Sequence, residues 1–200
     1  VALRTRLPID PLEHDRGVPP VRGLEGGAQA AREALARFVA RGLRRYAEEA
    51  RHPDAEACSG LSPYLHFGHI APHEVLAAVL DTEGRRLEQI GQDGAPTRGQ
   101  RAGFWGLSAA SEAFLDQLLT WRELAFNGAR WLPHYRRFDS LPAWAQATLA
   151  QHAADPRPAR YSLDTLERGE TADPLWNAAQ RQLREEGIVH NYLRMLWGKR

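Results

Sequence analysis

Cysteine is nearly absent from this 200-residue chain, since Cys58 is the only one. A single cysteine excludes a disulfide within the chain and is typical of proteins from a reducing compartment. No apolar run approaches the roughly 18 residues of a membrane-spanning helix. The first residues carry no signal-peptide pattern. Together these absences predict a soluble, cytoplasmic protein without a membrane partner.

Lysine is equally scarce, because Lys199 is the only one and arginine supplies nearly all the positive charge. The 26 basic and 25 acidic residues almost cancel. This balance excludes a chain that binds nucleic acid through net charge alone, although one face could still be basic.

The motifs of several enzyme classes are also missing. The sequence contains no G-x-S-x-G, no Walker loop, no G-x-G-x-x-G and no cysteine nucleophile motif. His66 and His69 are three residues apart, but no further ligand cluster completes a metal site, which favours packing or hydrogen-bonding roles for both. An enzyme of this kind would take its chemistry from a cofactor.

The apolar pattern predicts an all-α chain, because no alternation typical of strands persists. Residues 1–27 are rich in Pro and Gly and indicate a linker. Ser111 is a candidate N-cap for the longest predicted helix. The longer predicted helices span 28–51, 72–81, 112–131, 173–187 and 188–200, and two short ones lie within 133–155 and 162–170. The core face of the helix over 112–131 comprises Phe114, Leu115, Leu118, Leu119 and Leu124.

Three stretches carry candidate chemistry. In "ACSGLSPYLHFGHI", residues 57–70, small residues and hydroxyls could hold a diphosphate, or could simply form a capping turn. In "QLLTWRELAFN", residues 117–127, Trp121 beside Arg122 could stack on an unpaired base next to a phosphate contact, and α-helical spacing makes Gln117 a neighbour of Trp121. The alternative is a core tryptophan with a surface Arg–Glu pair.

The third stretch is "GIVHNYLRMLWGKR", residues 187–200. Val189, Leu193 and Leu196 form an apolar stripe at helical spacing. Next to it lies a mixed polar set that is unusual for a solvated face and typical of a ligand-facing one, namely His190, Asn191, Arg194 and Met195. An exposed polar face is the alternative.

In this order, the stretches resemble the flavin-binding helical domain of the DNA photolyase and cryptochrome superfamily. "SGLSPYLHFGHI" is similar to the loop that holds the FAD phosphates, and "DPLWNAAQRQLREEGIVHNYLRM" to the paired helices over flavin and DNA lesion, closest to class II pyrimidine-dimer photolyases. The resemblance covers residues 18–200. It implies a lead-in linker over 1–20 and, over 21–200, the first and central parts of the domain. The absence of an initial Met and of a final helix stop predicts a piece of a longer protein, truncated at both ends, that holds FAD poorly alone.

Carried over by position, the resemblance implies roles for individual residues. Contacts with FAD are implied for Tyr46, Ser59, Gly60, Leu61, Ser62, Asn191 and Arg194. Contacts with DNA are implied for Arg51, Trp121, Tyr192 and Met195. Arg122 joins this set as the candidate phosphate contact beside Trp121. Trp176 would belong to the tryptophan relay that photoreduces the flavin. Gln117 stands where repair enzymes carry a glutamate that hydrogen-bonds the dimer, so Gln117, Trp121, Asn191 and Trp176 form the predicted catalytic set.

Two functions therefore stay open at the level of sequence. The first is a light-driven carbon–carbon lyase, a monomer that uses FAD to split cyclobutane pyrimidine dimers in DNA and takes any second antenna chromophore outside this segment. The second is a cryptochrome-like blue-light photoreceptor without repair activity. Gln117 favours the second, and "DPLWNAAQ" favours the first.

Overall fold

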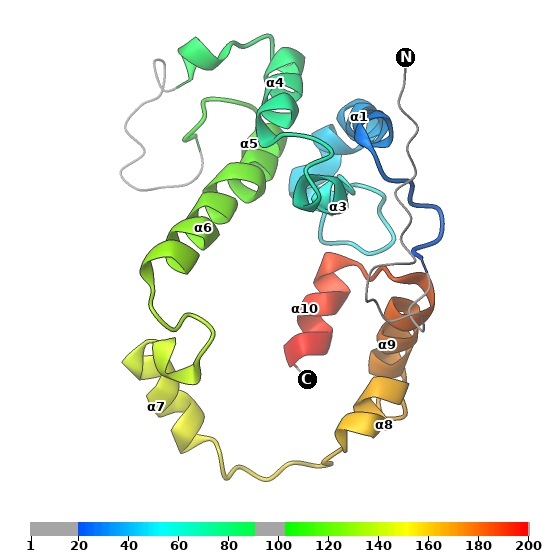
Figure 1. Ribbon diagram of the computed structural model, residues 1–200, viewed down its shortest axis with the longest axis vertical. Coiled ribbons are helices and arrows are strands. Elements are labelled where there is room, and N and C mark those ends of the chain that lie inside the picture. Colours follow the sequence, from blue (N-terminus) through cyan, green and yellow to red (C-terminus); the bar gives the residue numbers. More distant parts are fainter. Residues whose placement is uncertain (1–19, 91–102, 200) are drawn as a thin grey trace, which may run out of the picture. The chain divides into compact units, whose positions relative to one another are not determined.

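The computed structural model describes residues 20–90 and 103–199, and every regular element in these ranges is a helix (Figure 1). The prediction of an all-α chain is confirmed. Of the predicted linker 1–27, residues 20–27 are described and form turns and irregular backbone up to the first helix, and the remainder lies outside the described residues. Among the described helices, none combines the length and the apolar character that a membrane crossing requires.

The chain divides into two compact units. One comprises Glu25–Arg160 and the other Val1–Leu24 with Tyr161–Arg200. The helices of the larger unit are α1 (Ala28–Arg37), η1 (Phe38–Gly42), η2 (Leu43–Arg45), α2 (Tyr46–Glu49), α3 (Ser62–His66), α4 (Pro72–Thr82), η3 (Leu87–Gln89), α5 (Ala109–Leu115), η4 (Asp116–Trp121), α6 (Arg122–Trp131), η5 (Phe138–Ser140) and α7 (Ala143–Gln151). The smaller unit contains α8 (Leu163–Arg168), α9 (Pro174–Glu186) and α10 (Asn191–Lys199).

The first predicted helix is helical throughout but changes type along its length. It runs as α-helix in α1, as π-helix in η1, as 3₁₀-helix in η2 and again as α-helix in α2, ending at Glu49. The helical period predicts an apolar stripe here of Leu35, Phe38, Val39, Leu43 and Tyr46. It points inward, because Leu35, Phe38 and Leu43 are buried and the other two are half-buried. This stretch packs against α5 and α4, and these contacts form the core of the larger unit.

Gly42 sits where this helix approaches the loop before α3. A Cβ atom at Gly42 would lie 2.8 Å from Cδ2 of Phe38 and 3.3 Å from the carbonyl oxygen of Ala57. Both residues are buried, and the Phe38 ring is held by a ring contact with Phe114 at 4.6 Å between centroids. Only glycine therefore allows the helix and the loop to pack this closely.

We expect Gly42→Ala to lower the free energy of unfolding by about 1–3 kcal/mol, as overpacking of a tight core does. Alanine has the higher helix propensity, so the loss must come from the added contact. Gly128→Ala in α6 is the matched control, because its Cβ would meet nothing closer than Leu132 Cδ1 at 3.8 Å. Denaturant unfolding of both variants measures the difference, and equal stability of the two would contradict the packing argument.

The start of the long helix corrects one prediction. The N-cap is Ser108, whose Oγ accepts from the backbone N–H of Ser111 at 3.3 Å. The sequence predicts Ser111 as the cap, but Ser111 lies buried inside α5. Its hydroxyl instead donates to Glu83 at the end of α4. The sequence signal was ambiguous because two serines precede the apolar run.

Two carboxylates fix the loop that leads into α5. The buried Glu112 accepts from the backbone N–H groups of Gly103, Trp105 and Leu107. Glu83 accepts from Ser108 and Ser111. Burial raises the pKa of Glu83, but hydrogen bonds from Ser108 and Ser111 and the charge of Arg85 outweigh it, so the pKa lies below its ordinary value.

The predicted core face of the long helix is confirmed in its first half only. Phe114, Leu115 and Leu118 are buried and Leu119 is half-buried, whereas Leu124 is 56% exposed. The π-helical segment η4 adds one residue to the turn and therefore turns α6 by about 100° relative to a continuous α-helix. Leu124 consequently leaves the face that Phe114 and Leu118 share.

The smaller unit follows its capping signals closely. Asp173 caps α9 by accepting from the backbone N–H groups of Leu175 and Trp176, and Gly187 ends it with φ 72°. The last helix is shorter than predicted. It begins at Asn191 instead of Ile188, because the imidazole of His190 accepts from the N–H of Tyr192 at 3.2 Å and so caps the helix. Val189 therefore precedes the helix and does not extend its apolar stripe.

Candidate functional site

The loop Ser59–Ser62 presents small polar groups above a buried anchor. Leu61 and Ala57 are fully buried, whereas Gly60 and Ser62 are exposed. Gly60 adopts a left-handed φ of +65°, which turns the backbone between the two serines. Ser59 Oγ accepts from the N–H of Leu61 at 3.3 Å. The exposed part of this loop thus offers backbone and hydroxyl donors to an anion, while Leu61 serves as its apolar anchor.

Tyr46 belongs to an aromatic cluster next to this loop. Its ring meets Phe38 and Phe114 edge-on, at 5.9 and 5.3 Å between centroids. Burial raises the pKa of Tyr46, and the neighbouring Cys58 raises it further. The tyrosine is therefore held in the aromatic cluster close to Cys58, which immediately precedes Ser59.

The two histidines of this region have identifiable contacts. Nδ1 of His69 accepts from the backbone N–H of Gly27 at 3.1 Å, which ties the end of α3 to the start of α1. The His66 ring packs edge-on against Phe67. In the described residues, no three His, Cys, Asp or Glu side chains are grouped as a metal site would need.

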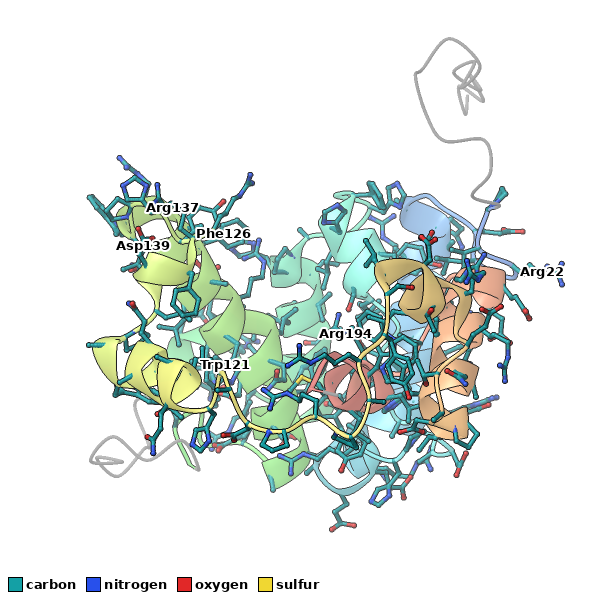
Figure 2. All side chains as sticks on the ribbon, turned by 90° about the horizontal axis from the view of Figure 1, so that it is seen from below. Arg22, Trp121, Phe126, Arg137, Asp139 and Arg194 are labelled. Carbon is teal, nitrogen blue, oxygen red and sulfur yellow. The ribbon has the colours of Figure 1, made fainter. Side chains whose placement is uncertain are left out.

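Trp121 lies on the continuous helical stretch formed by α5, η4 and α6, as does Phe126 (Figures 1 and 2). The indole is 53% exposed, which excludes the alternative of a core tryptophan. Its Nε1 donates to Oδ2 of Asp116 at 2.9 Å. The predicted neighbour Gln117 is also exposed, but the indole N–H donates to Asp116, five residues before Trp121.

The arginines predicted to bind DNA differ in their surroundings. Arg51 is exposed in the turn after α2. Arg122 pairs with Glu123 at 2.6 Å and its guanidinium lies over the Phe126 ring at 4.7 Å from the centroid. A phosphate would have to compete with Glu123 for Arg122, whereas Arg51 is the more accessible of the two.

In the smaller unit, α9 and α10 bring two tryptophans together. Trp176 and Trp197 stack with centroids 5.7 Å apart and planes 14° from parallel. Nε1 of Trp176 donates to the Trp197 carbonyl oxygen at 3.2 Å. Nε1 of Trp197 is buried and has no hydrogen-bond partner among the described residues. The cavity beside the pair measures about 60 Å³ and is far too small for a cofactor.

The polar residues of α10 pair with each other. The Arg194 guanidinium donates to Oδ1 of Asn191 at 2.6 Å, one helical turn away. Tyr192 and Met195 are both about half exposed. Helix α10 therefore carries a preformed amide–guanidinium pair and two accessible apolar side chains. Arg194 is labelled in Figure 2.

Two residues with clear contacts escaped the sequence interpretation. The sequence does not predict the Asp116 contact, because α-helical spacing pairs Trp121 with Gln117 and a π-helix has no simple sequence signature. It does not predict the role of Trp197 either, because its partner Trp176 lies on another helix. The six tryptophans of the chain were the available signal for such a pair.

Comparisons with known proteins extend these observations. No family model matches the chain. The chain is 33% identical over 189 residues to deoxyribodipyrimidine photo-lyase of Potorous tridactylus, which covers 94% of this chain and 32% of that protein. It is 35% identical over 175 residues to the protein of the same name from Methanothermobacter thermautotrophicus, covering 88% of this chain and 34% of that protein.

The fold agrees with these sequence relations. A bacterial class III photolyase from Agrobacterium tumefaciens matches with a TM-score of 0.55 and 25% sequence identity, over 86% of this chain and 30% of that one. The chain thus spans about a third of the length of the curated relatives it matches. Sequence and helical fold agree over most of the residues of this chain, and both identify it as photolyase-like.

Proposed function

We propose that this chain is the flavin-binding helical part of a photolyase that repairs cyclobutane pyrimidine dimers in DNA with blue light. The observation that carries the proposal is the identity of about a third, over some nine-tenths of the chain, to proteins named deoxyribodipyrimidine photo-lyase. The quoted "DPLWNAAQ" motif favours class II. We further propose that the protein acts as a cytoplasmic monomer, and that residues 21–200 serve this one role although they fall into two units.

The Ser59–Ser62 loop fits a cofactor with a diphosphate. Its exposed glycine lets the backbone approach an anion, and the hydroxyls of Ser59 and Ser62 add donors. When bound, reduced FAD would supply the light-excited electron that splits the dimer. Leu61 holds the loop in place, and Tyr46 supports it from the aromatic cluster.

The residues of the smaller unit have complementary proposed roles. Asn191 and Arg194 would hold polar groups of the flavin, as a hydrogen-bonded pair with fixed orientation. Trp176 would belong to the photoreduction relay. The stacking of Trp197 on Trp176 extends this role to a second indole, because two parallel rings in contact can pass an electron between them.

The chain would recognise DNA through two kinds of contact, namely arginine–phosphate contacts and stacking on the bases. Arg51 and, after release from Glu123, Arg122 would contact phosphates, so affinity should fall as salt is added. Trp121, Tyr192 and Met195 would pack on the extruded dimer, since base flipping leaves ring faces open to aromatic and apolar side chains. No nucleophilic side chain is needed, because the cofactor carries the chemistry.

A cryptochrome-like photoreceptor is the second candidate, and Gln117 favours it. Gln117 is exposed beside Trp121 and can donate and accept hydrogen bonds, but it lacks the charge of a glutamate. Hydrogen bonds of a charged group are stronger than those of a neutral one by about 1 kcal/mol.

The decisive experiment measures dimer reversal by the complete protein with reduced flavin under blue light. We expect the wild type to reverse dimers and Gln117→Glu to do so about fivefold faster, in line with a gain of about 1 kcal/mol. A dark incubation is the control. If neither protein reverses dimers, the photoreceptor takes the place of the photolyase.

A further inference from the structure

Trp121 is an exposed ring held at one edge by a buried side chain. Its indole is 53% exposed, whereas Asp116 is only 3% exposed. The two are joined by a hydrogen bond of 2.9 Å from Nε1 to Oδ2. A surface tryptophan normally satisfies its N–H with water, so a buried acceptor for an exposed ring requires a structural reason.

The π-helical segment makes this contact possible. Five residues advance about 140° around an α-helix, which would place Asp116 and Trp121 on different faces. In η4, which spans Asp116–Trp121, the wider turn brings residues five apart into register. Asp116 can therefore remain in the core while Trp121 stands directly over it and faces outward.

The side chain of Asp116 is itself held rigidly. Leu115 is fully buried and Leu118 nearly so, and they flank Asp116 in the core of the larger unit. Packed neighbours therefore fix the Oδ2 atom of Asp116. The hydrogen bond to this atom in turn restricts the orientation of the Trp121 indole. A ring that is already oriented loses less conformational entropy when it stacks on a ligand.

We propose that Asp116 is a positioning residue that orients the exposed Trp121 indole, through its N–H, for stacking on an unpaired pyrimidine. This inference rests on the proposed function, because it gives Trp121 a base to stack on. Because Asp116 is buried, this role requires no contact of its carboxylate with DNA or flavin. It acts only by holding the ring in the orientation that a planar ligand needs.

The first test is a double-mutant cycle in the complete protein, read as the ratio of Kd values for undamaged and dimer-containing duplexes. We expect Asp116→Ala to reduce this preference about tenfold, the loss typical of a hydrogen bond to a charged group. Asp116→Asn keeps an acceptor oxygen and should retain most of the preference. Asp139→Ala, which removes an exposed ion pair with Arg137 in the same unit, should change nothing.

Trp121→Phe completes the cycle, since it keeps a ring but deletes the N–H and leaves the buried carboxylate in place. We expect it to lose about as much preference as Asp116→Ala, and the double variant to lose no more than either single variant. If Trp121→Phe keeps the wild-type preference, or if the two losses add, the inference is overturned. This variant decides the matter even if Asp116→Ala fails to fold.

The second test does not depend on DNA. In protein labelled with ¹⁵N-indole tryptophan, the Trp121 resonance, assigned through Trp121→Phe, should move in Asp116→Asn and exchange faster with water in Asp116→Ala. An unmoved resonance would overturn the inference even if the wild type prefers damaged DNA. A moved resonance without any such preference in the wild type would instead show that the proposed function of Trp121 fails, and the positioning role with it.

Discussion

Gly60→Val is expected to remove most of the flavin from the purified protein. Gly60 holds φ at +65°, a conformation that costs an ordinary L-residue about 1–2 kcal/mol and a β-branched residue more. No atom lies within 4 Å of the position that a Cβ would take, so the substitution acts on the backbone and not through a clash. The loop should therefore relax into a conformation that no longer turns Ser59 and Ser62 toward one anion.

The measurement is the ratio of flavin absorbance to protein absorbance after purification, followed by titration with FAD. We expect the affinity to fall at least about tenfold, as a loss of 1.4 kcal/mol or more implies. Gly84→Val is the matched control, because Gly84 has φ +62°, equally open surroundings and a place at the end of α4. If Gly60→Val retains as much flavin as the control Gly84→Val, the Ser59–Ser62 loop does not bind the cofactor phosphates.

Trp121→Ala is expected to weaken binding to dimer-containing DNA by about ten- to a hundredfold. Stacking of a base on an aromatic side chain contributes about 1–3 kcal/mol, and this exposed indole would provide it. Affinity for undamaged duplex should stay nearly unchanged, because phosphate contacts carry that binding and do not involve the ring. The expected effect is therefore a loss of selectivity rather than of affinity for DNA in general.

Equilibrium binding of matched duplexes, with and without a single dimer and at one fixed salt concentration, measures this effect. Trp131→Ala is the control from the same helical stretch, since Trp131 is 67% exposed and lies under the Arg130 guanidinium. We expect Trp131→Ala to leave the selectivity intact. Equal losses on both DNAs after Trp121→Ala would contradict a role of this ring in recognising an extruded base.

The sequence by itself was sufficient for features that short-range physics controls. The apolar period of residues 28–51 predicts a helix with Leu35, Phe38 and Leu43 inside, and these three are buried. Asp173, Pro174 and Gly187 bound α9 as capping chemistry requires. These signals act within one or two helical turns, so the helices that they predict do not depend on the packing of the rest of the chain.

Tertiary structure decided where the helix departs from the α period. The π-helical turn of η4 moves Leu124 off the core face and pairs Trp121 with Asp116 instead of Gln117. The stacking of Trp176 on Trp197 likewise depends on how α9 meets α10. Neither feature has a local signature, because a π-helical turn is kept only where packing around it offsets its poorer backbone geometry, and that packing comes from residues far away in the sequence.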